Sequence, residues 1–349
     1  MKRRKLGSSG LELSVLGMGC WQYGGGSYWG NQDQQDVDQV VHQALDMGIN
    51  YFDTAEVYND GESERSLGLA LKGRRHEAII GSKISTANIL PEQLRKHCED
   101  SLQRLQTDYI DVYMLHWPVN PLAVKHFTSD PELIANPPQV AEVFEGLQRL
   151  KQEGKIRHIG VSNHGVKQLG EVLQTGASVA VNELAYSLLS RAIEEELLPY
   201  CKNQGVGVIG YMPLQQGLLS GKYHALDELK PILARTRHFH HSRGLGSRHG
   251  EEGAEPEITQ ALDQIRLLAD ELNLTMGVLS LAWAISNEGI TSTIVGSRNA
   301  DQLMGNAHAA QIELSADVLR RLNEITQPVL RKLGNNPDYY ENRHNSRSY

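Results

Sequence analysis

The chain alternates between short apolar runs rich in β-branched residues and longer segments whose apolar positions recur every three or four residues. The apolar runs predict eight strands, at 15–20, 49–53, 78–83, 109–116, 156–162, 178–182, 206–211 and 290–295. The periodic segments predict helices at 33–47, 62–72, 91–105, 139–153, 165–174, 192–203, 258–272 and 299–309. A strand followed by a helix, eight times over, predicts an α/β fold with a parallel eight-stranded (β/α)8 barrel, the TIM-barrel arrangement.

The alternative parallel fold is a doubly wound sheet that binds a dinucleotide, and the glycine pattern tests it. That fold requires G-x-G-x-x-G after the first strand, whereas the glycines of GMGCWQYGGG do not have this spacing. The stretch GLLSGKY resembles a phosphate loop, but it is one residue short and has no Ser or Thr after its lysine. The glycine pattern therefore favours the barrel.

Residues 1–334 are expected to form one (β/α)8 domain. Two of its connections are unusually long: 117–138, after the fourth strand, is rich in proline, and 222–256, after the seventh, is rich in His, Arg and Gly. Their lengths are typical of lids or binding loops. The polar tail 335–349 is expected to lie outside the domain and to be partly disordered.

Charge and composition exclude several classes of protein. The 349 residues carry a formal net charge of −8, which argues against a nucleic-acid binder. The three cysteines form no disulfide framework, and the histidines of the second long loop match no zinc spacing, so a solvated loop and no metal site are expected. No apolar run is long enough for a membrane span, and the basic N-terminus lacks the apolar run of a secretory signal. We therefore expect a cytoplasmic protein that acts on a small molecule.

Chemistry is concentrated where three consecutive strands end. Asp53, Lys83 and His116 close the second, third and fourth strands, 30 and 33 residues apart. Tyr58 follows in the loop after Asp53. Consecutive strands of a barrel are neighbours, and their carboxyl ends form the rim where active sites lie. We therefore expect these four side chains to converge.

Such a cluster suits proton transfer. A lysine ammonium in contact with a phenol favours the phenolate and lowers the pKa of the tyrosine, while Asp53 would keep Lys83 charged and in place. Tyr58 would then act as the general acid of a carbonyl reduction, or as the base of the reverse reaction, with His116 orienting the carbonyl or sharing the proton. Taken singly, each residue has an ordinary structural interpretation, as a helix cap, a surface charge or a packed ring. Four of them at successive strand ends favour the catalytic one.

The chain resembles the aldo-keto reductase superfamily from about residue 5 to residue 325. The resemblance rests on GINYFDTAEVYNDGESERSLG, SKIS, YIDVYMLHWP, KIRHIGVSNH, GYMPLQQGLLSGKY and IVGSRNADQLMGNAHA, in that order. It is strongest to the bacterial branches similar to voltage-gated potassium channel beta subunits. It implies a catalytic tetrad of Asp53, Tyr58, Lys83 and His116. It also implies reduction of an aldehyde or ketone, a sugar or a small keto compound among them, with NAD(P)H as the hydride donor.

The resemblance also implies a cofactor site. Ser162, Asn163 and Glu183 would hold the nicotinamide carboxamide, with Tyr211 stacked on the ring and Trp21 and Asp53 beside it. Glu183 departs from the family's usual glutamine, and unless it is protonated it cannot donate a hydrogen bond. The pyrophosphate would be covered by the residues around the seventh strand's loop: Met212, Pro213, Leu214, Gly217, Leu218, Gly221 and Lys222.

The adenosine end is expected near the last helix. Gly296, Ser297 and Arg298 precede that helix, whose N-terminus attracts anions, and arginine binds phosphate in a bidentate manner. The trio suits the 2′-phosphate of NADP(H), so NADP(H) is favoured, with NAD(H) as the alternative. Gln302 and Asn306 would contact adenine, and Arg235 would clamp the adenosine. The substrate is expected to meet Trp21, Tyr28, Trp29, Tyr58, His116 and Trp117.

Two other functions stay open on the sequence alone. The chain could be a regulatory subunit that binds the nucleotide without turnover, as the channel beta subunits suggest. It could also be a barrel lyase in which Lys83 forms a Schiff base. Asp53 argues against the lyase because it would keep the amine charged. A monomer and a homo-oligomer are both consistent with the resemblance.

Overall fold

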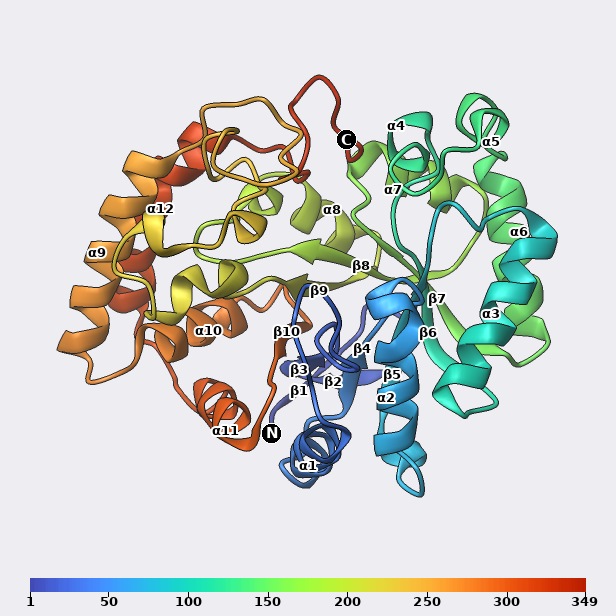
Figure 1. Ribbon diagram of the computed structural model, residues 1–349, viewed down its shortest axis with the longest axis horizontal. Helices are drawn as coiled ribbons and strands as arrows, with labels where there is room; N and C mark the ends of the chain where they lie inside the picture. Colours follow the sequence, from blue (N-terminus) through green and yellow to red (C-terminus); the bar gives the residue numbers. More distant parts are fainter.

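Eight parallel strands close into a barrel in the computed structural model, which describes residues 1–349 (Figure 1). Around the barrel the strands are hydrogen-bonded in the order β10, β3, β4, β5, β6, β7, β8 and β9. Their bounds are β3 (Leu16–Gly19), β4 (Tyr51–Asp53), β5 (Ile79–Ile84), β6 (Ile110–Leu115), β7 (Ile156–Ser162), β8 (Val179–Ala185), β9 (Gly207–Tyr211) and β10 (Ser292–Gly296). The predicted parallel (β/α)8 barrel is confirmed.

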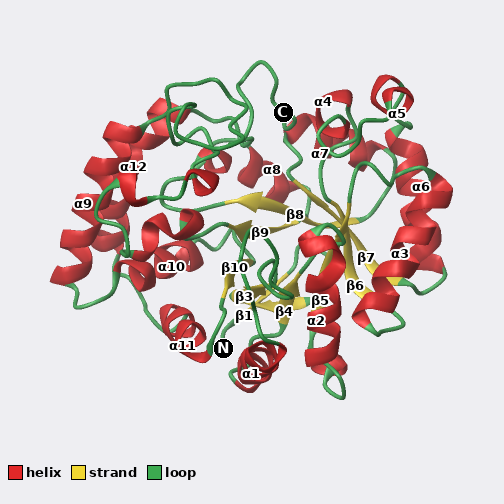
Figure 2. Ribbon diagram, in the orientation of Figure 1, coloured by secondary structure: helices red, strands yellow, loops and turns green.

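Helices surround the strands on the outside, as Figure 2 shows. They are α1 (Gln34–Asp46), α2 (Glu62–Ala70), α3 (Pro91–Leu105), α6 (Val140–Gln152), α7 (Val166–Gln174), α8 (Leu197–Asn203), α10 (Met276–Ser286) and α11 (Ala300–Ala309), with α9 (Glu255–Glu271) and α12 (Ala316–Leu333) packed together beyond them. Their apolar faces form one core with the outer sides of the strands. In α1 the buried stripe is Val37, Val40, Val41, Ala44 and Leu45, as its periodicity predicts.

Some elements differ from the expectation. The segment expected as one helix at 192–203 is a 3-10 turn, Ala192–Glu194, followed by α8. The helix α10 was not predicted; nine of its eleven residues are buried, so it lacks the one-sided stripe that marks a surface helix. Other short 3-10 segments are Arg75–Glu77, Leu226–Glu228 and Pro231–Leu233.

An antiparallel hairpin of β1 (Arg3–Lys5) and β2 (Glu12–Ser14), which was also not predicted, lies against the N-terminal end of the barrel. Its Leu6 and Leu13 are fully buried among the apolar side chains that fill the barrel interior. One of these, Tyr51, lies against Gly81 on the neighbouring strand β5, where a Cβ would stand 2.1 Å from its hydroxyl. Only glycine fits there, and the barrel is a packed core rather than a pore.

The two long loops carry short helices and turns. The loop at 117–138 contains α4 (Pro121–Val124) and α5 (Pro131–Ala135). The loop after β9 is not the solvated segment expected from its composition, because Arg237 and His238 are fully buried. His238 stacks on Tyr339 with 4.7 Å between ring centroids, and Arg237 pairs with Glu251 at 3.0 Å.

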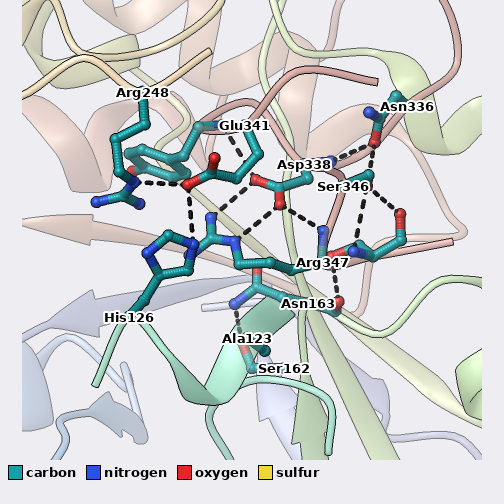
Figure 3. A network of polar contacts seen from close by, with 12 residues as sticks. Ala123, His126, Ser162, Asn163, Arg248, Asn336, Asp338, Glu341, Ser346 and Arg347 are labelled. Carbon is teal, nitrogen blue, oxygen red and sulfur yellow. Dashed lines mark hydrogen bonds and ion pairs between the residues drawn. The ribbon is translucent and has the colours of Figure 1, made fainter. Parts of the chain in front are cut away.

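The C-terminal tail, residues 335–349, differs from the partly disordered segment expected. It crosses the molecule between the two long loops, and Asp338, Tyr339 and Arg347 in it are at most 2% exposed. Figure 3 shows why so polar a segment is ordered: its polar side chains bind one another and the neighbouring loops. The Arg347 guanidinium donates to Asp338 at 2.8 and 2.9 Å, and Glu341 accepts from Arg248 at 2.5 Å and lies 3.1 Å from His126.

No single helix is long and apolar enough to cross a membrane; only α9 and α10 taken together meet that test, and they are bent by 96° at their junction.

Candidate active site

Lys83 is the centre of the predicted tetrad. Its Nζ lies 2.6 and 2.7 Å from the two carboxylate oxygens of Asp53, at the end of the neighbouring strand β4. It also donates to the carbonyl of Thr54 at 3.1 Å and lies 3.3 Å from the hydroxyl of Tyr58. Lys83 is completely buried and Asp53 is 2% exposed. The strand ends therefore bring the acid, the amine and the phenol into contact, as the spacing predicts.

The loop that carries Tyr58 is held by its neighbour. Tyr58 begins the 3-10 segment Tyr58–Gly61, in which Asn59 and Asp60 have φ angles of 50° and 54°. The Asn59 amide donates to the carbonyls of Trp21 and Tyr23 at 2.7 and 2.9 Å. Asparagine is one of the few residues that tolerate this left-handed backbone, and its side chain here ties two loops together. The phenol is thereby fixed next to Lys83.

The pKa of Tyr58 moves opposite to the expected direction. Burial raises it above the ordinary value, Lys83 lowers it, and Asp53 and Glu183 raise it again. Burial by itself lowers the pKa of Lys83, but Asp53 and Glu183 outweigh that effect and keep the amine charged. The prediction considered only the ammonium; it was wrong on the net direction of the pKa because burial of the phenol outweighs the effect of Lys83, and Asp53 and Glu183 add to the effect of burial.

His116 faces Tyr58 and is neutral. The two rings meet edge to face with 5.7 Å between centroids. Burial lowers the pKa of His116 well below its usual value, and the positive charges of Lys83 and Arg347 lower it further. Its Nδ1 is buried with no hydrogen-bond partner. A neutral imidazole beside the phenol can orient a carbonyl oxygen, as expected.

Glu183 belongs to the same cluster. It lies on β8 opposite Ser162 on β7, and its Oε1 is 3.3 Å from Lys83 Nζ. Its side chain is 3% exposed, and its Oε2 is buried without a hydrogen-bond partner. Burial and the nearby Asp53 raise the pKa of Glu183 well above its usual value, which Lys83 only partly offsets.

The residues expected around a nicotinamide form one network at the ends of β7 and β9. Asn163, with φ 60°, donates from its amide to the His116 carbonyl at 3.1 Å and to Ser162 Oγ at 3.0 Å. Its Oδ1 accepts from the Tyr211 hydroxyl at 2.7 Å. Ser162 Oγ donates to the Glu183 carbonyl at 3.0 Å. These four residues, Ser162, Asn163, Glu183 and Tyr211, thus lie together at or near the carboxyl ends of β7, β8 and β9.

The loop after β9 turns sharply, as expected for a segment that approaches a ligand closely. Met212, Gln215, Gln216, Gly217 and Gly221 all have positive φ, and the 3-10 segment Gln215–Ser220 lies among them. Pro213, Leu214 and Leu218 share this loop. Lys222 is exposed, with its Nζ 4.5 Å from the centroid of Tyr223, so its charge is available to an anion.

The segment expected to bind the adenosine end, Gly296–Arg298, is held in place before α11. Asn306 donates to Ser297 Oγ at 3.0 Å, and Gln302 accepts from the Arg298 backbone at 2.9 Å. The Arg298 guanidinium donates to Gln32 at 2.8 Å and to the carbonyls of Trp29 and Asn31. These contacts use three of its five N–H groups, and two remain for a phosphate.

Aromatic rings line the mouth above Tyr58. Trp21 stacks on Tyr28 and on Tyr58, with centroid separations of 4.8 and 5.6 Å, and meets Trp29 edge to face. Arg235 lies 5.5 Å from the Tyr28 ring, on this aromatic wall. The expected substrate residues Trp21, Tyr28, Trp29 and Tyr58 therefore form a single group.

The C-terminal tail adds residues that the sequence did not indicate. Arg347 lies 3.5 Å over the ring of Trp117, which is 7% exposed. Ser348 donates to the Asn163 carbonyl at 2.5 Å, and the Tyr340 hydroxyl lies 3.4 Å from Met212 Sδ. The tail thus touches three expected site residues. The only sequence signal was the tail's mixture of aromatic residues with Asp and Arg, which is unusual for a disordered end.

Comparison with known proteins agrees with this geometry. The sequence model of the Aldo/keto reductase family matches residues 15–327. The chain is 33% identical to the NADH-specific methylglyoxal reductase of Escherichia coli, over 94% of this chain and 100% of that protein. It is 29% identical to the aldo-keto reductase YhdN of Bacillus subtilis, over 95% of both chains.

Solved structures give the same answer. An aldo-keto reductase of Klebsiella pneumoniae in complex with NADPH superposes with a TM-score of 0.71 at 26% identity, over 94% of this chain and 96% of that one. An aldo-keto reductase of Bacillus halodurans in its holo form superposes with a TM-score of 0.71 at 27% identity, over 93% and 96%.

Proposed function

This chain belongs to the aldo/keto reductase family, and we propose on that basis that it interconverts a carbonyl compound and an alcohol with NAD(P)H, Tyr58 being the general acid. The observation that carries the proposal is the contact of the Tyr58 hydroxyl with Lys83, 3.3 Å away, while Asp53 holds that amine by two short hydrogen bonds. A buried, permanently charged amine next to a phenol has an evident use in proton transfer.

The reaction needs a hydride and a proton. A bound reduced nicotinamide supplies the hydride to the carbonyl carbon. The O–H bond of Tyr58 breaks as the carbonyl oxygen takes the proton, and the phenolate is stabilised by Lys83. An alkoxide is a much stronger base than a phenolate, so this transfer is favourable although the pKa of Tyr58 lies above its ordinary value. Neutral His116 orients the carbonyl oxygen towards the phenol.

The residues present fit a nicotinamide cofactor. The Oε2 atom of Glu183 is buried without a hydrogen-bond partner, and a carboxamide, with its NH₂ donor and its carbonyl acceptor, would pair with that carboxyl group in either protonation state. Ser162 and Asn163 would hold the carboxamide beside it, and Tyr211 would pack on the ring. The sharply turned loop from Met212 to Gly221, together with the exposed Lys222, would cover the pyrophosphate.

We infer a preference for NADP(H) from the other end of the site. Ser297, Arg298 and the N-terminus of α11 would offer a hydroxyl, a guanidinium and a positive helix end to a 2′-phosphate, and Gln302 and Asn306 would contact the adenine. Neighbours bound to NADPH support this choice. The NADH-specific relative from Escherichia coli represents the alternative.

The substrate we propose is a small aldehyde or ketone. The rings of Trp21, Tyr28 and Trp29 form an aromatic wall next to Tyr58, whose ring in turn meets His116. The name of the relative from Escherichia coli makes methylglyoxal the first compound to test.

The test is consumption of NADPH and NADH with methylglyoxal, glyceraldehyde and 4-nitrobenzaldehyde. Replacement of Tyr58 by Phe should lower kcat by roughly 10²–10⁴ without loss of cofactor binding. Tyr109→Phe is the matched control, since Tyr109 precedes β6 at the opposite end of the barrel, between Arg75 and Arg157. A Tyr58→Phe enzyme with more than half of the wild-type rate would refute the assignment.

A further inference from the structure

The Lys83 cluster contains one carboxyl group more than its charge requires. Asp53 alone neutralises the ammonium, through two hydrogen bonds of 2.6 and 2.7 Å. Glu183 adds a second carboxyl group 3.3 Å from the same nitrogen, and all three side chains are at most 3% exposed. Two ionised carboxylates against one ammonium would leave a net negative charge in a site closed to water, which is costly. A single bound proton removes that cost.

The geometry indicates which group carries the proton. Asp53 has both oxygens on Lys83, whereas Glu183 has one oxygen on Lys83 and one with no partner at all. An ionised carboxylate with an orphaned, buried oxygen is the less stable of the two arrangements. Burial and the nearby charge of Asp53 raise the pKa of Glu183, in agreement with this geometry.

We propose that Glu183 is a protonated carboxylic acid in the free enzyme and that it releases its proton when the oxidised nicotinamide binds, but not when the reduced one binds. This rests on the proposed cofactor site, in which Glu183 lies beside the nicotinamide. The oxidised ring carries a positive charge and the reduced ring none. The positive ring stabilises the ionised carboxylate at short range in a buried site.

The balance of the step is simple. The O–H bond of Glu183 breaks, its carboxyl group changes from neutral to −1, and the proton passes to the solvent as binding proceeds. The ring and the carboxylate then form an ion pair. A glutamine, which the resemblance implies at this position in relatives, could not make this change. Glu183 would therefore make this chain's preference for the oxidised cofactor depend on pH.

Other titratable groups face the cluster and must be separated from Glu183. Asp53 lies on β4, Lys83 on β5, and the phenols of Tyr51, Tyr58 and Tyr211 on or after β4 and β9. Tyr58 is the strongest competitor, because it too could lose a proton beside a positive ring. Asp53 is the ionised partner of Lys83 in this arrangement, so it has no proton to release. Loss of a proton from Lys83 would leave the buried carboxylate of Asp53 without a positive partner.

The experiment is calorimetric titration of the full-length protein with NADP⁺, NADPH, NAD⁺ and NADH. Each titration is run in two buffers of different ionisation enthalpy, and the difference in binding enthalpy gives the number of protons released. The wild type should release up to one proton per oxidised cofactor bound and none per reduced cofactor. Glu183→Gln should bind both forms without release, and Tyr58→Phe should keep the release. As the pH rises, the wild-type Kd for the oxidised cofactor should fall on the order of tenfold per pH unit, while the Kd of Glu183→Gln should not depend on pH.

Four results overturn the inference. Release that persists in Glu183→Gln, or disappears in Tyr58→Phe, assigns the proton elsewhere. Binding of both forms without release refutes the inference while leaving the proposed function intact. Failure of the wild type to bind any nicotinamide cofactor refutes both. If Glu183→Gln is poorly folded, infrared spectra of the wild type decide: the carbonyl band of a protonated carboxylic acid should vanish with oxidised cofactor and persist with reduced cofactor.

Discussion

Glu183 Oε1 lies 3.3 Å from Lys83 Nζ, so the buried ammonium contacts the carboxyl groups of two different strands, β4 and β8. Either carboxylate could serve as its counter-ion if the other were neutral. Lys83 would thus keep its charge after the loss of Asp53 alone, because Glu183 would ionise in its place. The two acids are partly redundant.

This redundancy predicts non-additive kinetics. Asp53→Asn should lower kcat/KM by only about tenfold, well short of the roughly 10²–10⁴-fold loss expected for Tyr58→Phe. The double variant Asp53→Asn, Glu183→Gln leaves Lys83 buried without a counter-charge and should lose more than the product of the single effects. Steady-state kinetics of the four enzymes measure this. Strictly multiplicative losses would contradict the redundancy.

The proton on Glu183 also predicts how stability depends on pH. An unfolded glutamate has a pKa near ~4.3, and burial raises the pKa of Glu183 in the folded chain. Its stabilising effect is therefore fully present below about pH 4 and is lost as the pH rises towards the folded pKa. Glutamine at position 183 has no proton to lose. The free energy of unfolding of Glu183→Gln, relative to that of the wild type, should therefore increase by up to about 1.4 kcal/mol per pH unit above pH ~4.3.

Urea unfolding of both proteins from pH 5 to pH 8 measures that difference. Groups far from the cluster titrate alike in the two proteins, so the difference reports Glu183 together with Asp53, Lys83 and Tyr58, whose pKa values depend on it. Glu252→Gln, a change of the same kind at an exposed position, is the control and should give a difference independent of pH. A flat difference for Glu183→Gln as well would mean that Glu183 is already ionised in the folded protein.

A third prediction concerns the cofactor preference. Arg298→Ala should weaken NADPH binding by about 10–100-fold and leave NADH binding unchanged, because a charged hydrogen bond contributes about 1.5–3 kcal/mol. Arg298 also holds the loop at Trp29–Gln32, so the variant could act through that loop. Gln32→Ala separates the effects, since it loosens the loop and keeps the guanidinium. Fluorescence titration of the wild type and both variants with each cofactor measures the six dissociation constants; equal losses for both cofactors in Arg298→Ala would refute the 2′-phosphate assignment.

The sequence predicted the barrel and the tetrad for a definite physical reason. Strand and helix periods are local, and regular spacing places Asp53, Lys83 and His116 at neighbouring strand ends once the fold is a parallel barrel. Contacts between distant segments leave no such trace. Glu183 is 100 residues from Lys83, and only the closing of the barrel brings them together. The pKa of Tyr58 was therefore predicted from Lys83 alone, whereas burial, Lys83, Asp53 and Glu183 together determine it.

The tail shows the same limit from composition. Polar residues at a chain end predict disorder when they have only water to bind. Asp338 and Arg347 instead bind each other in the interior, nine residues apart, and Ser348 reaches Asn163 across 185 residues. Local hydrophobicity carries no information about such pairs.

The fourth prediction concerns this tail. Asp338 and Arg347 form an ion pair in which both side chains are at most 2% exposed, and Arg347 covers Trp117 at the mouth of the site. Asp338→Asn leaves a buried, unpaired guanidinium and should cost about 3–5 kcal/mol of stability. Because the tail then loosens over Trp117, KM for the carbonyl substrate should rise. The equivalent acid-to-amide substitution at an exposed ion pair, Glu324→Gln beside Arg320, is the control and should lower the stability by less than about 1 kcal/mol.

A double variant separates the ion pair from mere packing. In Asp338→Asn, Arg347→Met the unpaired charge is gone, and an apolar side chain can still lie over the indole of Trp117. Since removing both partners of a buried pair is often close to neutral, the second substitution should restore most of the stability lost in the first, and KM should return towards the wild-type value. Urea unfolding and steady-state kinetics of the three variants decide the matter. If the double variant is no more stable than Asp338→Asn, the tail is held by its other hydrogen bonds rather than by this pair.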